Sequence, residues 1–322
     1  MERPAQPART ALQIALALGL ASAGLLATAC GHGHTQATDF SYVPPVVDPA
    51  YSATDAPLVL IDEGHCNFHT ADGRYRPFAE LLRGDGFVVE GLNDGFTVES
   101  LAVAEVLVIA NALSEANCEK WRLPNPPAFS RREIATVVEW VEGGGALLLI
   151  ADHMPFPGAA AELASAFGLV FIDGYARPDD GSGPGIRFDR QAGTLAEHAV
   201  TAGRSDAERV EAVVSFTGQG FRAVGDAVPI LTLPPATTLR LPREAGEFPD
   251  DTPSFSAEGL LQGAVLLHGA GRVAVFGEAA MFSAQEISRD GELYQFGMNA
   301  PGAEENAQFV LNVLHWLTGL ID

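Results

Sequence analysis

The chain has 322 residues, of which 47% are hydrophobic and 19% are charged. This length and composition are sufficient for one sizeable buried α/β core. The formal net charge is −22, and so negative a protein repels the phosphates of nucleic acids and of anionic membrane surfaces. We therefore exclude nucleic acid as a partner and membrane lipid as an electrostatic one.

The first thirty residues have the organisation of an export signal. Arg3 and Arg9 precede an apolar segment from Ala11 to Ala27, and small residues stand directly before Cys30. This pattern resembles a bacterial lipoprotein signal, in which Cys30 is lipidated and becomes the mature N-terminus. A plain cleavable signal and an uncleaved anchor are the alternatives.

The lipoprotein resemblance implies an exported protein at the periplasmic or extracellular face of the cell envelope. Residues 1–30 would be the signal, and the membrane would be contacted only through the lipid anchor. Residues 31–55 are rich in His, Thr, Pro and Ala, a composition that predicts a flexible tether.

Apolar segments alternate with helical patterns through the first half of the chain. The central segment, Ala146 to Ala151, is continuously apolar, as in a strand buried on both faces, and it ends at Asp152 and His153. Ser130 and Glu133 form a capping-box pattern at the start of a helix. The expected strands are 58–62, 87–89, 105–110, 146–151 and 169–171, and the expected helices are 75–82, 98–103, one following Ser130, and 159–167. This alternation predicts right-handed βαβ units and a parallel sheet in the flavodoxin-like order 2-1-3-4-5.

The second half is richer in short strands. A surface loop is expected from Asp173 to Gly193, and a long helix from about Ala303 to Leu317, ended by Gly319. Short strands are expected at 210–216, 229–233, 263–268 and 272–276, the last two joined by the hairpin signal Gly269-Ala270-Gly271. The prediction is one three-layer α/β domain, residues 56–320, with a mostly parallel sheet, helices on both faces and extra strands in the C-terminal half.

Two motifs near the C-terminus, Gly271–Phe282 and Glu305–Leu317, carry a family resemblance. Together with the first half, they make residues 56–320 similar to class I glutamine amidotransferase-like domains, including trehalose-utilisation-type proteins and relatives of gliding-motility and intraflagellar-transport-type domains. Amidotransferases of this class place a nucleophilic cysteine after the central strand and a His-x-Glu pair downstream. Here the sequence is Ala151-Asp152-His153-Met154 and no His-x-Glu follows. Glutamine hydrolysis by thiolate attack is therefore not expected.

Cys66 and Cys118 follow the first and third expected strands. These strands are neighbours in the 2-1-3-4-5 order, so their outgoing loops would lie side by side. Export permits a disulfide, and we expect one between these two cysteines.

Polar residues cluster where the expected strands end. The loop after the first strand carries Asp62, Glu63, His65, Asn67 and His69, the central strand ends at Asp152 and His153, and Glu278 and Asn299 follow the late strands. In an open α/β sheet, ligands bind at the carboxyl ends of the strands. We therefore expect a polar crevice there.

Two functions fit this crevice. His65, His69, Asp152 and His153 are the ligand types of a divalent metal such as zinc, and Glu63 or Glu278 could act as general base in a metal-dependent hydrolase. Alternatively, Asp62, Asn67, Asp152, His153 and Asn299 could bind a small molecule or another envelope protein without catalysis. Each residue could also be structural, since Asp152 can cap the following helix. The density of histidines and carboxylates favours the hydrolase, whereas the missing nucleophile favours the non-catalytic binding domain, which is the prediction we carry forward.

Overall fold

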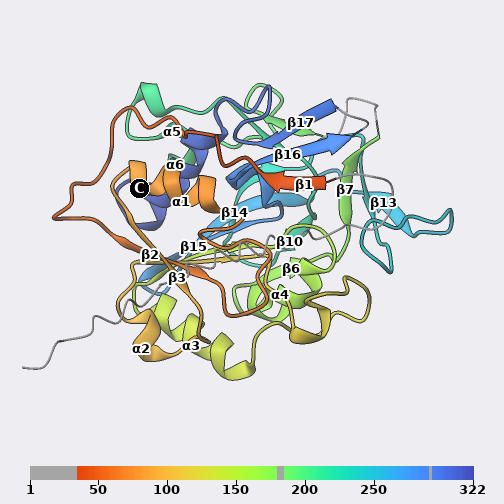
Figure 1. The fold of residues 1–322 in the computed structure, drawn as a ribbon, viewed down its shortest axis with the longest axis horizontal. Helices are drawn as coiled ribbons and strands as arrows, with labels where there is room; N and C mark the ends of the chain where they lie inside the picture. The colour runs from red at the N-terminus through yellow and green to blue at the C-terminus, as the bar shows by residue number, and fades with distance from the viewer. Residues whose placement is uncertain (1–34, 180–184, 290–291) are drawn as a thin grey trace, which may run out of the picture.

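The computed structural model describes residues 35–179, 185–289 and 292–322 (Figure 1). The expected signal segment and Cys30 lie outside the described residues. The fold is mixed α/β, with a large sheet and few helices. Within the described ranges, none of the helices has the length and apolar character needed to cross a bilayer.

A nine-stranded sheet forms the centre of the molecule. Its strands run in the order β3 (Val88–Leu92), β2 (Leu58–Asp62), β4 (Val106–Ala110), β5 (Ala146–Ile150), β15 (Gly271–Phe276), β14 (Leu261–His268), β10 (Phe221–Ala223) and β6 (Leu169–Phe171), with β11 (Val228–Thr232) also paired to β14. The pairs from β3 to β15 are parallel and the remaining pairs are antiparallel. The sheet is therefore mixed, not mostly parallel.

The order of the first four strands agrees with the prediction, but the fifth position is occupied by a different strand. We expected Leu169–Phe171 beside β5. Instead β15 lies there, and Leu169–Phe171 forms β6, the last strand of the sheet at the edge far from β3. The position beside β5 is covered on both faces, and Val273, Ala274, Val275 and Phe276 of β15 are all fully buried. β6 has three residues and its Val170 is 50% exposed, which suits an edge strand. The predicted hairpin between β14 and β15 is confirmed.

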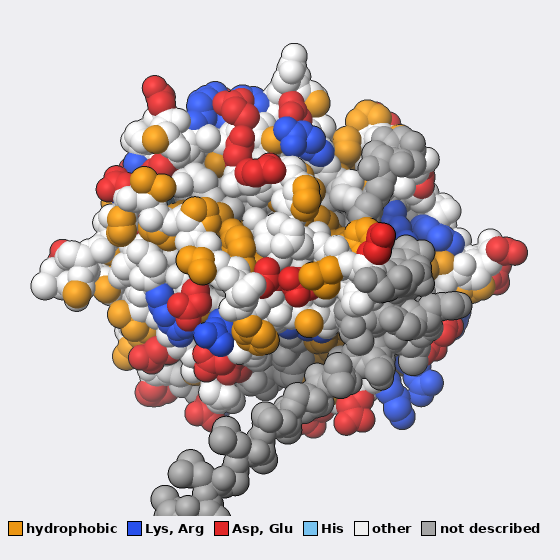
Figure 2. All heavy atoms as spheres, turned by 45° about the horizontal axis from the view of Figure 1, so that its top comes forward, with side chains coloured by type: hydrophobic (Ala, Val, Ile, Leu, Met, Phe, Trp, Pro, Cys, Tyr) orange, Lys and Arg blue, Asp and Glu red, His pale blue; other side chains and the backbone are white. Residues whose placement is uncertain are grey.

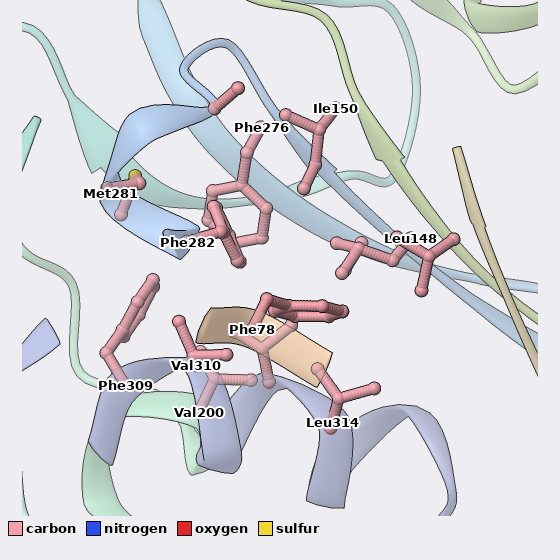
Figure 3. Close-up of a cluster of buried hydrophobic side chains, with 14 of the residues drawn as sticks. Phe78, Leu148, Ile150, Val200, Phe276, Met281, Phe282, Phe309, Val310 and Leu314 are labelled. Carbon is pink, nitrogen blue, oxygen red and sulfur yellow. The ribbon is translucent and has the colours of Figure 1, made fainter. Parts of the chain in front are cut away.

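Two apolar cores lie on the two faces of the sheet. In β4, Val106 and Val108 belong to one core, whereas Leu107 and Ile109 belong to the other, as the period of two along a strand requires. The first core is covered by α1 (Arg76–Gly84), α5 (Ala199–Ala202) and α6 (Asn306–Leu317), and the second by α2 (Val98–Leu101), α3 (Arg131–Glu142) and α4 (Phe156–Ala166) (Figure 1). Figure 3 shows Phe78, Phe276, Phe282 and Phe309 converging in the first core.

Smaller sheets surround the central one. They consist of β1 (Thr35–Thr38), β16 (Ala284–Arg289) and β17 (Glu292–Gly297); of β13 (Ser254–Ser256), β12 (Thr237–Arg240) and β7 (Tyr175–Pro178); and of β8 (Ile186–Asp189) and β9 (Ala212–Ser215). Single 3-10 turns lie at Glu115–Asn117, Asp206–Glu208 and Ala280–Phe282. The expected surface loop Asp173–Gly193 thus contains two strands, because β7 and β8 find partners far along the chain.

Part of the segment that we expected to be a tether contacts the domain. β1 pairs with β16 in an antiparallel register, and Asp39 is only 6% exposed. The Tyr51 hydroxyl lies 2.6 Å from Thr318 Oγ1, next to the end of α6. Residues 35–51 are therefore connected to the domain by specific contacts.

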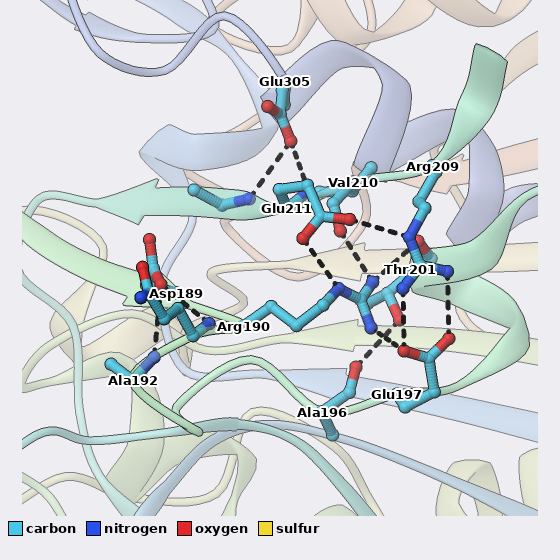
Figure 4. A network of polar contacts seen from close by, with 12 residues as sticks. Asp189, Arg190, Ala192, Ala196, Glu197, Thr201, Arg209, Val210, Glu211 and Glu305 are labelled. Atoms are coloured by element: carbon cyan, nitrogen blue, oxygen red, sulfur yellow. Dashed lines mark hydrogen bonds and ion pairs between the residues drawn. The ribbon is translucent and has the colours of Figure 1, made fainter. Parts of the chain in front are cut away.

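A group of arginines and glutamates holds the segment from β8 to β9 (Figure 4). Arg190 forms ion pairs with Glu197 and Glu211, and donates to the carbonyls of Thr201 and Val210 at 3.2 and 2.8 Å. Arg209 contacts the same two glutamates. These contacts connect β8, β9 and the short helix α5.

Candidate functional site

Four polar residues lie at the carboxyl ends of four adjacent parallel strands of the central sheet. Asp62 is the last residue of β2, Asn111 follows β4, Asp152 follows β5 and Glu278 follows β15. The register aligns Ala110 with Ile150 and Ile150 with Phe276, so the strands end at the same level. The carboxyl ends of the strands therefore form a row of polar side chains, as expected.

Asn111 connects two of the predicted site residues. Its side-chain oxygen accepts a hydrogen bond from the Asp152 backbone N–H at 2.8 Å, and its amide nitrogen lies 3.1 Å from His69 Nδ1. Asn111 is 1% exposed and has a φ of 53°, which asparagine tolerates better than most residues. Asn111 was not among the site residues predicted from the sequence. The sequence feature that could have identified it is an asparagine directly after a buried strand, where the side chain can form hydrogen bonds with the loop after a neighbouring strand.

His69 is held as a neutral ring. Burial lowers the pKa of His69 well below its usual value, and the charges of Arg74 and His153 lower it further. A neutral imidazole nitrogen can accept a hydrogen bond from Asn111. The contact between the two side chains is thus consistent with the electrostatic environment.

Asp152 accepts hydrogen bonds from neighbouring loops. Its carboxylate receives the backbone N–H groups of His153 at 2.7 Å and Ala279 at 3.3 Å, and the hydroxyl of Thr217 at 3.3 Å. His153 Nδ1 lies 2.7 Å from the Met154 carbonyl, to which it donates. Asp152 therefore joins the turn after β5 to the segments before β10 and after β15.

Glu278 is fully buried and shapes the turn after β15. Its carboxyl group accepts the N–H groups of Ala280 at 3.0 Å and Met281 at 2.7 Å. Burial raises the pKa of Glu278 well above its usual value, and the nearby Asp152 charge raises it further. With these contacts, the Glu278 carboxyl group holds the turn after β15.

His65 lies between two carboxylates. Its Nδ1 is 2.8 Å from Asp62 Oδ1 and its Nε2 is 3.0 Å from Glu133 Oε1. Burial alone would lower the pKa of His65, but Asp62 and Glu133 outweigh it and the pKa is raised. Because Glu133 also belongs to the confirmed capping box at Ser130, His65 attaches the loop after β2 to the start of α3.

The other loop residues also have protein partners. Asn67 donates to Asp62 Oδ2 at 2.9 Å and accepts from the His65 N–H at 2.9 Å. Glu63 accepts the backbone N–H of Ala71 at 2.8 Å. Cys66 is joined to Cys118 in the expected disulfide, with a Cα–Cα distance of 5.5 Å.

The predicted metal ligands do not form one coordination group. Both ring nitrogens of His65 contact carboxylates, while Asp152 is occupied by hydrogen-bond donors. In the part of the chain that the structure describes, no three His, Cys, Asp or Glu side chains are arranged to hold a metal ion. The donors at the strand ends do not fit a metal, and we derive no metal chemistry here.

Asn299 does not belong to the row of strand ends. Its amide nitrogen donates to Asp39 Oδ2 at 3.0 Å and to the Gln285 carbonyl at 3.3 Å. It therefore ties the segment after β1 to β16. The sequence could not separate this role from a role in the crevice, because its partners lie 260 and 14 positions away.

A row of aromatic rings extends along the loops beyond the strand ends. We call it the ring row; its members, in spatial order, are Phe68, Trp121, His153, Tyr175 and Phe248. Successive ring centroids are 4.8, 6.3, 4.1 and 5.1 Å apart, and His153 stacks on Tyr175 with 12° between the planes. All but Tyr175 are partly exposed. Of the residues in the ring row, only His153 was predicted from the sequence as a site residue.

Two long loops bring the ring row together. The Leu123 N–H donates to the Arg243 carbonyl at 2.9 Å, and the Ala245 N–H donates to the Trp121 carbonyl at 2.8 Å. The loop before α3 therefore pairs with the loop before Phe248. Burial raises the pKa of Tyr175 above its usual range, Asp152 adds to this, and the Gly246 N–H at its hydroxyl opposes it.

Comparison with known proteins adds information about the fold. No family model and no curated protein matches this chain. Among solved structures it is similar to the "mmIFT52 N-terminal domain", with a TM-score of 0.56 and 15% identity over 81% of this chain and 97% of that chain. The likeness is one of fold.

ThuA-like proteins are also among the structural neighbours, at low identity. A putative ThuA-like protein from Bacteroides uniformis ATCC 8492 has a TM-score of 0.43 and 14% identity, covering 84% of this chain and 95% of that one. A cytoplasmic protein from Salmonella typhimurium has a TM-score of 0.46 and 16% identity, covering 81% and 98%.

Proposed function

We propose that this chain is an exported, lipid-anchored, non-catalytic binding domain with an amidotransferase-like fold, and that it takes a small-molecule ligand on the ring row. One observation carries the proposal. The polar side chains at the strand ends are bonded to neighbouring loops, whereas Trp121, His153 and Phe248 present partly exposed rings beside them. Aromatic faces contribute binding area at low cost in conformational entropy.

The chemistry of the strand ends supports binding over catalysis. Cys66 and Cys118 are joined to each other, so neither offers a thiolate to a substrate. His65 contacts Asp62 and Glu133 through its two nitrogens, which leaves no nitrogen to activate a nucleophile. The same contacts argue against the metal-dependent hydrolase as the function of this edge.

Ligand-dependent thermal unfolding of the full chain tests the proposal. A panel of small aromatic and saccharide compounds should contain one that stabilises the wild type, by about 1.4 kcal/mol at ten times its Kd. Trp121→Ala should lose that response, and the matched variant Trp140→Ala on α3 should keep it. Zinc bound in stoichiometric amounts and lost in His65→Ala or His153→Ala would contradict the proposal.

A further inference from the structure

The outer sheet of β13, β12 and β7 has one buried face and one face that carries arginines. In antiparallel pairs, directly opposed residues lie on the same face. Arg240 is opposite Tyr175, whereas Leu239 is opposite Ala176. Leu239 and Ala176 are fully buried, so Tyr175 and Arg240 share the other face. Arg177, two residues after Tyr175, lies on that face as well.

Two guanidinium groups on this face lie over one ring. Arg177 Cζ is 5.1 Å and Arg240 Cζ is 4.5 Å from the centroid of the Phe248 ring. Within the described residues, neither arginine forms an ion pair with a carboxylate, whereas Arg190, Arg204 and Arg209 all do. The chain has 41 acidic and 19 basic residues, and Figure 2 shows Asp and Glu side chains spread over one face of the molecule.

The two arginines are close enough to repel each other. Burial lowers the pKa of Arg177, Tyr175 opposes this, and the Arg240 charge lowers it again. A bound anion would remove this repulsion and would occupy N–H donors that lack a carboxylate partner. Guanidinium groups bind carboxylate, phosphate and sulfate through paired N–H donors.

The arginines lie at one end of the ring row. Phe248 contacts Tyr175 edge-on at 5.1 Å, Tyr175 stacks on His153 at 4.1 Å, and His153 is followed by Trp121 at 6.3 Å. Two arginines without a carboxylate partner therefore adjoin a row of partly exposed aromatic side chains.

We infer that Arg177 and Arg240 bind the anionic group of a ligand whose planar or apolar body lies on the ring row. The inference rests on the proposed function and adds to it the chemical class of the ligand. It assigns the two arginines a role in specificity, since a neutral ligand of the same shape would lack their contacts.

Titration calorimetry with phenyl phosphate tests the inference on the full chain, with benzyl alcohol as the neutral probe. Phenyl phosphate should bind more tightly than benzyl alcohol, and raising the salt from about 0.05 to 0.5 M should weaken only phenyl phosphate. The double variant R177Q/R240Q should weaken phenyl phosphate by about tenfold or more and leave benzyl alcohol within about twofold. Arg222→Gln removes one positive charge at an exposed position of β10 and should change neither affinity.

Two outcomes would overturn the inference: equal phenyl phosphate affinity in the double variant and the wild type, or no phenyl phosphate binding at all. Failure of the binding proposal is separately visible. If benzyl alcohol binds the wild type and Trp121→Ala abolishes that binding, the ring row is a binding surface even when the arginines contribute nothing. If Trp121→Ala leaves the affinities of both probes unchanged, the proposal that the ring row is a binding surface is wrong.

Discussion

Replacing Asn111 tests whether the strand ends are braced as the structure indicates. Asn111 accepts from the Asp152 N–H, contacts His69 Nδ1 and has a φ of 53°. Asn111→Gly removes the side-chain contacts but accepts the positive φ. Asn111→Ala removes the same contacts but keeps a Cβ, in a backbone conformation that alanine disfavours. The pair of variants therefore separates hydrogen bonding from backbone strain.

The expected magnitudes follow from burial. Leaving the Asp152 N–H and His69 Nδ1 without a partner costs about 1–3 kcal/mol each, so Asn111→Gly should lower the free energy of unfolding by about 2–6 kcal/mol. The left-handed conformation costs alanine about 1–2 kcal/mol, partly offset by the about 0.4–1 kcal/mol that alanine gains over glycine through the unfolded chain. Asn111→Ala should therefore be less stable than Asn111→Gly by about 1 kcal/mol.

Urea unfolding monitored by tryptophan fluorescence measures both differences, since the chain has three tryptophans. Asn93→Gly, at an exposed position, is the matched control and should cost less than about 1 kcal/mol. If Asn111→Gly unfolds at the same urea concentration as the wild type, the side chain does not stabilise the strand ends as proposed. An alanine variant as stable as the glycine variant would refute the backbone argument.

Three further predictions concern the same loops and the N-terminus. The pKa of His65 is raised in the folded protein and that of His69 is lowered. The stability that His65 contributes should therefore be present below about pH 6.5 and lost as the pH rises through its folded pKa. The stability that His69 contributes should be present above about pH 6.5 and lost as the pH falls through its folded pKa. The stability difference between wild type and His65→Gln should therefore shrink between about pH 5.5 and 8.5, and that for His69→Gln should grow; parallel pH profiles would contradict both. Cys66→Ala/Cys118→Ala opens a loop with a sequence separation of 52 and should lower the free energy of unfolding by about 4 kcal/mol in the chain-entropy model, which urea unfolding with and without reductant checks. Cys30→Ala should abolish incorporation of a labelled fatty acid and release the protein from membranes. Undiminished labelling of this variant would contradict the lipoprotein prediction.

The first half of the fold could be predicted because its strands are local and continuously apolar. The segments at Leu58, Glu105 and Ala146 read as strands buried on both faces, and they occupy the predicted order. β15 was predicted as a strand too, but its place was not. A sequence pattern indicates that a strand is buried, but it does not indicate which of several apolar strands will be its neighbour. The pairing of β15 with β5 joins residues more than 100 positions apart.

The positions of the polar residues at the strand ends could be predicted from the sequence, but their partners could not. Asp62, Asp152 and Glu278 lie at the expected edge, because polar residues directly after parallel strands must lie there. Whether a side chain is free for a ligand depends on its partners, and these come from distant segments: Glu133 for His65, Ala279 for Asp152. The arginines and Phe248 had no pattern that set them apart from ordinary surface residues.

The division between the strand ends and the ring row has a physical cause. Each parallel strand must turn sharply at its carboxyl end, and the first polar residue there is the nearest group that can satisfy the N–H groups of the turn. Asp62, Asp152 and Glu278 each accept backbone N–H groups within a few residues of themselves. The ligand surface that we propose is built from side chains farther out, on loops whose length the sheet does not dictate. Those loops carry Trp121 and Phe248, and a likeness of fold at 15% identity carries no information about them. Under the proposed function, substitutions in these loops should change binding without changing the sheet.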